Sequence, residues 1–204
     1  MIKRAKKVAE KAVLIIIDVQ NDFCPGGSLA VPHGDEVVAP LNSMVELFNA
    51  NEFPVFVTRD WHPAKTKHFK DYGGIWPPHC VQHTFGACFH SDLRFIGAEI
   101  ITKGTSEDED EKSYSGFGGV NFAGQNLAKL LTSRHVANLY IGELATDYCV
   151  KATALDALKL GFTIYLLKDA VRAVNINTDD GKKAIAEMKK AGAKIITTKE
   201  VLGR

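Results

Sequence analysis

The sequence predicts an α/β fold in which helices cover both faces of a mostly parallel, six-stranded sheet, giving three layers (α/β/α). Short apolar runs rich in Val and Ile alternate along the chain with segments whose apolar residues recur at helical spacing. These runs are apolar along nearly their whole length, as is typical of strands buried on both faces. The chain of 204 residues is 46% hydrophobic and shows no internal repeat or linker, so we interpret residues 1–204 as a single domain.

Each strand is expected at one of the apolar runs. Their brevity and their β-branched residues favour strands over buried helices. Because helical segments separate them, neighbouring strands are expected to run parallel. In chain order the runs are "VLIIID" (13–18), "PVFVTRD" (54–60), "EIITK" (99–103), "VANLYIG" (136–142), "FTIYLLKD" (162–169) and "KIITT" (194–198).

Helices are expected between the strands, where apolar residues recur three and four positions apart. The clearest patterns are Val37, Val38, Leu41, Met44, Val45 and Phe48, then Leu127, Leu130 and Leu131, then Val150, Leu155 and Leu158. The last pattern belongs to "TDYCVKATALDALKLG", which is expected to be a helix capped by Thr146 or Asp147. Two stretches, 61–98 and 104–119, lack this periodicity, and long irregular segments of a compact domain are often functional.

Composition narrows the class of ligand and the compartment. Twenty-five basic and 24 acidic residues leave a net charge of +1, so we expect a small-molecule ligand and no nucleic-acid partner. The acidic cluster at 107–111 is interpreted as a solvated loop. The apolar run near the N-terminus is too short for a signal or membrane segment, which predicts a cytoplasmic protein with no membrane partner. The spacing of the cysteines indicates free thiols: Cys24, Cys80, Cys88 and Cys149.

Reactive side chains follow four of the predicted strands. Asp18, Asp60 and Lys103 end the first three strands, and the fourth leads through "GELATDY" to Cys149. Each alone has a plainer interpretation, as a helix cap, a partner of a backbone amide, a solvent-seeking lysine or a buried thiol. Ligands of open parallel sheets bind beyond the carboxyl ends of the strands, so four such residues at equivalent positions favour a catalytic site.

Cys149 has the surroundings expected of a nucleophile. It would lie in the first turn of the predicted helix, where backbone N–H groups and the helix dipole favour a thiolate. A carboxylate at Asp18 beside an ammonium at Lys103 could accept the thiol proton. A Cys–His pair is the alternative, but none of the seven histidines follows Cys149, which gives that pair no support.

A candidate metal site lies in the irregular segment after the second strand. Asp60, His62 and His79, with His68 as an additional candidate, offer carboxylate and imidazole ligands that suit Zn²⁺ or another divalent transition metal. Three protein ligands would leave positions open, as in catalytic or substrate-orienting sites. Two alternatives remain: a polar loop that merely holds histidines, and a closed structural site that includes Cys80.

The motifs resemble those of a known family. In order they are "IIIDVQNDFCPGGSLAV", "VFVTRDWHPAKTKHF", "WPPHCVQHTFGACFH", "TKG", "SYSGF" and "LATDYCV". Together they resemble the nicotinamidases, also called pyrazinamidases, of the isochorismatase-like cysteine hydrolase superfamily. The resemblance covers nearly the whole chain. Two features depart from it, namely Glu143 where glycine is expected and the acidic loop at 107–111.

The resemblance implies hydrolysis of nicotinamide to nicotinate and ammonia through a thioester, in NAD salvage. It makes Cys149 the nucleophile, Asp18 the general base and acid, and Lys103 their electrostatic partner. It makes Asp60, His62 and His79 the ligands of a divalent metal, usually zinc but iron or manganese in some members. The position of His68 is a ligand in some members and a serine in others. Homo-oligomers are common in the family.

The resemblance also implies a substrate pocket. Phe23 and Trp76 match its aromatic walls, although both could instead be ordinary core residues. The backbone N–H groups of Ala145 and Cys149 match the donors that meet the oxyanion. The peptide bond between Leu144 and Ala145 is expected to be cis.

Two other functions compete with this interpretation. One is another amidase or a vinyl-ether hydrolase of the superfamily, such as one acting on isochorismate, which has no pyridine nitrogen for a metal to hold. The other is a catalytically silent binding module. The metal-ligand set argues against the first, and the intact Asp18, Lys103 and Cys149 argue against the second.

Overall fold

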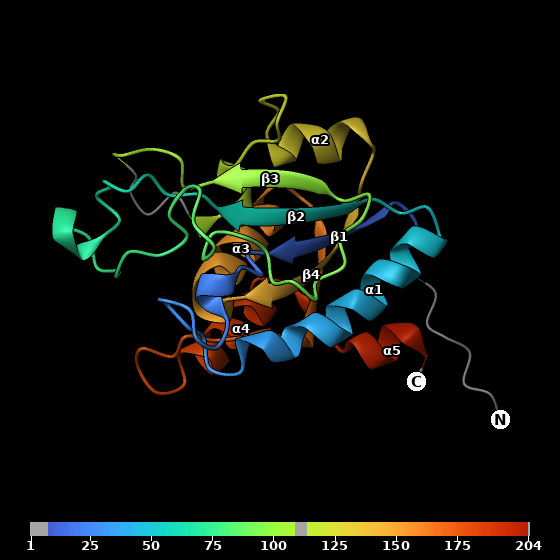
Figure 1. The fold of residues 1–204 in the computed structure, drawn as a ribbon. Helices are drawn as coiled ribbons and strands as arrows, with labels where there is room; N and C mark the ends of the chain where they lie inside the picture. Colours follow the sequence, from blue (N-terminus) through green and yellow to red (C-terminus); the bar gives the residue numbers. More distant parts are fainter. Residues whose placement is uncertain (1–7, 109–113, 204) are drawn as a thin grey trace.

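The computed structural model describes residues 8–108 and 114–203 and contains the predicted six-stranded sheet. All of its strands are parallel, in the order β3-β2-β1-β4-β5-β6 (Figure 1). The predicted α/β class is therefore confirmed. The strands are β1 (Ala12–Ile17), β2 (Val55–Asp60), β3 (Glu99–Lys103), β4 (Asn138–Leu144), β5 (Thr163–Arg172) and β6 (Lys194–Ile196).

The largest differences from the predicted strands are in β4 and β5. β4 continues beyond Gly142 to Leu144, and β5 continues beyond Asp169 to Arg172. Their pairing shifts register between Ile141 and Glu143. Polar residues near the end of β5 hide this extension from the apolar pattern. The backbone of Glu143 stays within β4, and the peptide bond that follows Leu144 is cis, as expected.

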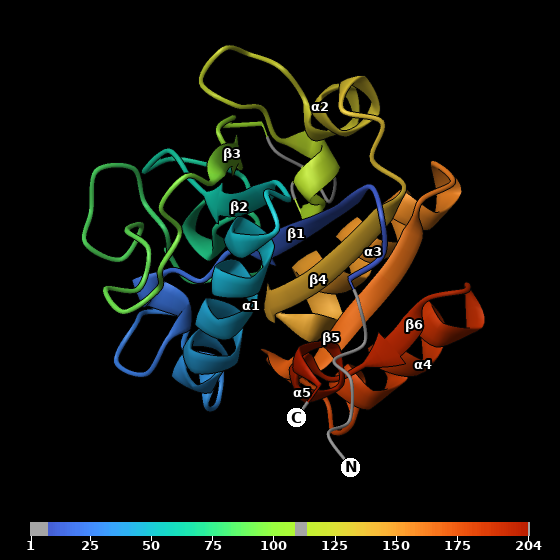
Figure 2. The same cartoon turned by 90° about the vertical axis from the view of Figure 1, so that its right-hand side faces the viewer.

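Helices cover both faces of the sheet. α1 (Val38–Ala50) and α5 (Thr198–Leu202) pack on one face, and α2 (Leu127–Ser133), α3 (Lys151–Lys159) and α4 (Asp180–Lys190) on the other (Figure 2). The three-layer arrangement follows from the helical spacing of their apolar residues. Each helix presents one apolar stripe, which must be buried against the sheet.

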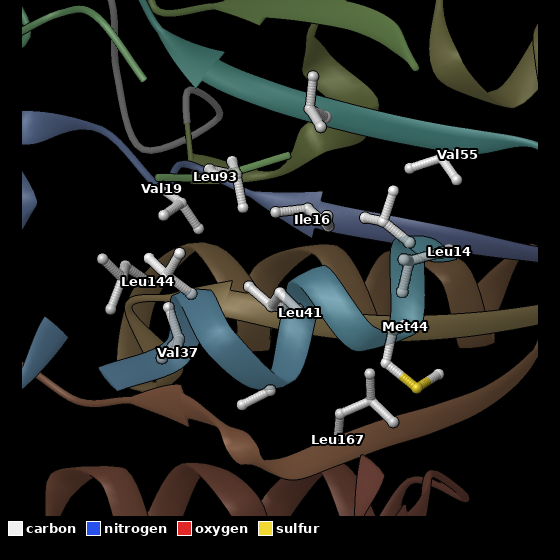
Figure 3. Close-up of a cluster of buried hydrophobic side chains, with 14 of the residues drawn as sticks. Leu14, Ile16, Val19, Val37, Leu41, Met44, Val55, Leu93, Leu144 and Leu167 are labelled. Atoms are coloured by element: carbon white, nitrogen blue, oxygen red, sulfur yellow. The ribbon is translucent and has the colours of Figure 1, made fainter. Parts of the chain in front are cut away.

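The central strand β1 shows how the two cores are separated. Leu14 and Ile16 face the α1 side, whereas Val13, Ile15 and Ile17 face the α3 side, because successive side chains of a strand point to opposite faces. All are essentially inaccessible to solvent. On the α1 side these side chains pack against residues that include Leu41 and Met44 (Figure 3). Truncating one of these Leu or Ile side chains to Ala should cost about 2–5 kcal/mol.

The predicted cap of the Cys149 helix is wrong. Thr146–Val150 form a π-helical turn that precedes α3, and the residue at the cap position is Ala145, with no side-chain hydrogen bond. The Asp147 carboxylate instead accepts the backbone N–H groups of Val174 (3.0 Å) and Asn175 (2.8 Å). A tertiary contact with the loop after β5 has replaced the local cap.

Several other expectations concern the chain as a whole. The four cysteines are free, and only Cys88 is exposed. In the part of the chain that the structure describes, no helix is long and apolar enough to cross a membrane. Residues 1–7, with most of the basic N-terminal charges, lie outside the described residues, as do residues 109–113 of the acidic loop.

Candidate active site

The carboxyl ends of three adjacent strands bring the predicted reactive residues together. Asp60 and Lys103 end β2 and β3 and lie opposite each other in the ladder, and Asp18 follows β1 directly. Cys149 lies in the turn after β4, the other neighbour of β1. In Figure 1 the arrowheads of β1, β2 and β3 point toward the irregular segment 61–98. All four side chains are buried, and the strand ends together with the turn after β4 bring them to one edge of the sheet.

Lys103 is the centre of this cluster. Its Nζ lies 2.8 Å from Asp18 Oδ2, 2.5 Å from Asp60 Oδ1 and 3.6 Å from Cys149 Sγ. The ammonium therefore bridges two buried carboxylates and also reaches the thiol. Hydrogen bonds to charged groups are stronger than those between neutral groups, so this cluster is held rigidly.

Burial and neighbouring charge set the protonation of these groups. Burial raises the pKa of Asp18, and the Lys103 ammonium only partly opposes the rise. Burial alone would lower the pKa of Lys103, but the Asp18 and Asp60 carboxylates outweigh it and raise that pKa well above its ordinary value. For Asp60, burial is likewise outweighed by Lys103 and His62, which lower its pKa. Asp18 is thus the carboxylate that takes up a proton more readily.

Thr58 is a partner of Asp18 that sequence reasoning missed. Its Oγ1 donates a hydrogen bond of 2.6 Å to Asp18 Oδ1. Thr58 and Asp60 are two residues apart on β2, so their side chains share one face of the sheet. The alternation of β2 could have identified Thr58, but a threonine in a strand is too common to attract notice.

Three histidines form a second cluster beside the first. His62, His68 and His79 are buried, and each offers a ring nitrogen within 4.8 Å of the others'. The rings of His62 and His68 stack with their centroids 4.6 Å apart, and the His62 and His79 centroids are 5.0 Å apart. The structure therefore brings the additional candidate, His68, into the same cluster as the two predicted ligands.

Two imidazoles of this cluster, those of His68 and His79, are in the neutral form that binds metals. His79 Nδ1 lies 2.8 Å from Pro77 O, and because a carbonyl can only accept, this nitrogen carries the proton and Nε2 is the nitrogen that could bind a metal. Burial, together with the neighbouring His62, lowers the pKa of His68 to about 3 and that of His79 to about 4. Both rings are therefore neutral near pH 7.

Asp60 connects the two clusters. Its Oδ1 accepts from Lys103, and its Oδ2 lies 3.8 Å from His62 Nε2. Three imidazoles are a donor set that fits a divalent transition metal. Asp60, a predicted ligand, falls in the group with Asp18 and Cys149 rather than with the three histidines. Among the residues that the structure describes, Cys80 is not in either group of side chains that could share a metal, so the closed structural site is not supported.

A pocket lies between the clusters and opens over Cys149. The aromatic residues Phe23 and Trp76 line it, as expected, together with Leu29, Asp60, His68, His79, Tyr114, Ala145, Tyr148, Cys149 and Val174. The Phe23 ring lies 5.4 Å from that of His79. Leu144 does not reach the pocket with its side chain, which lies in the core on the α1 side (Figure 3).

Tyr114 and Tyr148 complete the aromatic wall. Trp76 Nε1 donates a 2.8 Å hydrogen bond to Tyr114 Oη, and the rings of Trp76 and Tyr148 meet edge to face with centroids 4.9 Å apart. Both tyrosines lie within quoted motifs, "SYSGF" and "TDYC". Their contribution to the pocket was not predicted, because it depends on how the loops fold over the sheet.

The comparisons with known proteins agree with this geometry. The isochorismatase domain family matches residues 12–200. The chain is 37% identical to the nicotinamidase of Escherichia coli K12, over 90% of this chain and 93% of the relative. It is also 37% identical to a nicotinamidase/pyrazinamidase of Mycobacterium tuberculosis, over 90% and 97%.

Solved structures extend the agreement. The pyrazinamidase of Pyrococcus horikoshii in complex with zinc is 45% identical, with a TM-score of 0.82 over 92% of this chain and 99% of that one. PnC1 from L. infantum in complex with nicotinate is 36% identical, with a TM-score of 0.84 over 96% and 98%. The chain therefore belongs to the isochorismatase domain family, in the branch that contains the nicotinamidases.

Proposed function

We propose that this protein is a metal-dependent cysteine amidohydrolase that converts nicotinamide and water to nicotinate and ammonia. The observation that carries the proposal is the contact of one buried ammonium, Lys103 Nζ, with both Asp18 and Cys149, beside a pocket that Cys149 lines together with His68 and His79. The nicotinamidases among its relatives and the nicotinate complex of a structural neighbour support the choice of substrate.

Cys149 forms the covalent intermediate. Its Sγ attacks the carboxamide carbon, and the thiol proton passes to Asp18. The same proton then goes to the departing nitrogen, so the C–N bond breaks with release of ammonia and a thioester to Cys149 remains. The raised pKa of Asp18 suits a group that must first accept a proton and then donate it.

Lys103 holds the Asp18 carboxylate and the Cys149 sulfur close to each other. The 2.8 Å contact with Asp18 and the 3.6 Å contact with Cys149 Sγ place the carboxylate and the sulfur on the same ammonium. That ammonium stabilises negative charge on the sulfur as the proton leaves. Because its pKa is raised well above the ordinary value, Lys103 stays charged throughout.

Two backbone groups meet the charge that develops on the substrate oxygen. These are the N–H groups of Ala145 and Cys149, both of which line the pocket. Donors of this kind are worth about 10²–10³ in rate, because they are aimed at the tetrahedral intermediate. Water then attacks the thioester with its proton passing to Asp18, and return of that proton to the sulfur regenerates the thiol.

A divalent metal would be held by His62, His68 and His79, with Asp60 Oδ2 beside them. When bound, it supplies a Lewis acid for the pyridine nitrogen of nicotinamide. We propose Zn²⁺, as in the zinc complex of the Pyrococcus horikoshii neighbour, with Fe²⁺ or Mn²⁺ as alternatives. Phe23, Trp76 and Tyr148 form the walls between which the substrate ring lies.

The proposal is tested by ammonia release from nicotinamide. The purified, zinc-loaded protein is compared with Cys149→Ala and with a sample treated with a chelator. Release by the wild type alone supports both the nucleophile and the metal requirement. Absence of release from the zinc-loaded wild type contradicts the substrate assignment, and release from benzamide-type or aliphatic amides instead would point to another amidase of the family.

A further inference from the structure

We propose that Gln20 and Asp22 are positioning residues that hold the metal-binding loops in place. Neither offers a ligand atom to the histidine cluster. Both lie within four residues after Asp18 in the chain, and each reaches across to a different part of the metal site. This inference rests on the metal site proposed above and assigns to two further residues the task of shaping it.

Gln20 clamps the backbone of Asp60. Its side chain is completely buried, and its Oε1 accepts the N–H of Asp60 at 2.7 Å. Its Nε2 donates to Asp60 O at 2.8 Å and to Ala87 O at 2.9 Å. One carboxamide thus satisfies both polar groups of the Asp60 backbone, and all of its own bonds are made to the main chain. The orientation of Asp60 therefore depends on Gln20.

Asp22 clamps the backbone next to His79. Its Oδ2 accepts the N–H of Cys80 at 2.7 Å, and its Oδ1 accepts the N–H of Ser28 at 3.1 Å. Cys80 in turn accepts the N–H of His62 at 2.9 Å through its carbonyl. The Asp22 carboxylate therefore holds the short backbone connection between His79 and His62.

The backbone at this clamp needs support. Cys80 has a φ of 44°, in the left-handed region that residues with a side chain rarely adopt. The space around Asp22 is also tight, since a Cβ at Gly86 would lie 2.0 Å from Asp22 Oδ2. A small backbone shift here would move His79 relative to His62 and His68.

The metal site needs such clamps because His62, His68 and His79 lie outside every helix and named strand that the structure describes. The backbone of His62 is held by isolated bonds, from His62 N to Cys80 O and from Gln82 N to His62 O, and hydrogen bonds from side chains add to this support. Residues that orient metal ligands in this way typically contribute 10–100-fold to metal affinity. We therefore expect Gln20→Met and Asp22→Ala each to weaken zinc binding by about that factor.

The test is a competition titration of Zn²⁺ between the metal-free protein and a chelating dye. Asp22→Asn is a milder variant, since its amide oxygen can still accept the Cys80 N–H, and it should fall between Asp22→Ala and the wild type. The alkylation rate of the Cys149 peptide, read by mass spectrometry, checks that the triad of Asp22→Ala is intact.

Asp169→Ala is the matched control. The Asp169 carboxylate also accepts two hydrogen bonds, from Thr198 N (2.8 Å) and Oγ1 (2.7 Å), but it joins β5 to α5. The zinc affinity of Asp169→Ala should equal that of the wild type. This should hold even if the free energy of unfolding of Asp169→Ala falls by as much as that of Gln20→Met or Asp22→Ala. Unchanged affinity in Gln20→Met and Asp22→Ala, or equal loss in Asp169→Ala, would overturn the inference. A wild type that binds no zinc would instead refute the metal site itself.

Discussion

The two halves of the site are built by different means, although both are buried and share Asp60. Asp18, Asp60, Lys103 and Cys149 sit at or just beyond strand ends, where the register of β1, β2 and β3 fixes Asp18, Asp60 and Lys103 to one another. The histidines sit on loop 61–98, where their positions depend on isolated backbone bridges and on individual hydrogen bonds from side chains. A sheet supplies rigidity to every residue at its edge, whereas a loop needs each contact made separately.

Removing the ammonium that joins the halves should have the largest effect. Lys103→Met leaves Asp18 and Asp60 as buried carboxylates without their bridging cation. We expect a loss of about 3–5 kcal/mol in the free energy of unfolding and about 10³-fold or more in kcat. Urea unfolding and ammonia release measure the two. A Lys103→Met protein within tenfold of wild-type kcat would show that the contact with Cys149 is incidental.

Removing one histidine should show that the two halves of the site work independently. His62→Ala takes away a proposed metal ligand but none of the contacts of Lys103 with Asp18 or Cys149. Zinc affinity and nicotinamide turnover should each fall by about 10²-fold or more, while the alkylation rate of Cys149 stays near that of the wild type. If alkylation of Cys149 slows as much as turnover does, the two clusters are not independent.

In the metal-free protein, the buried histidines should make the free energy of unfolding depend on pH. The pKa values of His68 (about 3) and His79 (about 4) lie below the unfolded value of 6.5, so between these values the unfolded chain binds more protons. Stability should therefore fall as pH drops below about 6.5. The raised pKa of Asp18 acts in the opposite direction.

The contribution of one histidine is isolated by a variant. The free energy of unfolding of metal-free His79→Asn should depend less on pH than that of the wild type between about pH 7 and pH 5. Parallel curves for the two proteins would mean that His79 is not held neutral by burial.

The smallest effect is expected at an exposed ion pair on the loops. Lys67 Nζ and Asp108 Oδ1 are 2.6 Å apart, but both side chains are mostly exposed. Such pairs contribute little because water and salt screen them. Lys67→Ala should leave the melting temperature and zinc affinity unchanged, because the backbone bond from Lys67 N to Glu107 O remains. A clear drop in zinc affinity would show that this pair, too, holds the His68 loop.

The contrast between strand ends and loops also explains which features could be predicted from the sequence. The strands were predictable because β-branched runs such as "VLIIID" carry a strong local signal, and their polar last residues then identified Asp18, Asp60 and Lys103. The cap of the Cys149 turn was predicted wrongly, because Asp147 bonds to the loop after β5 rather than to its own turn.

The loop half was predictable only in part. Residue type suggested His62, His68 and His79 as ligands, but no periodicity indicated where the chain would bring them. The clamps made by Gln20 and Asp22, and the wall residue Tyr114, depend on contacts between segments far apart in the sequence. A single sequence shows that these residues are present, but it does not show which distant residues they contact.

The division of labour between the halves is tested most directly by comparing nicotinamide with benzamide, which has the same carboxamide but no ring nitrogen. Ammonia release is measured for both amides, with the protein zinc-loaded and metal-free. If the histidine cluster orients the substrate through a metal, kcat/KM should strongly favour nicotinamide in the loaded protein, and removal of the metal should lower the value for nicotinamide to no more than that for benzamide. Equal kcat/KM values for the two amides in the zinc-loaded protein, or a preference for nicotinamide that survives metal removal, would contradict the account.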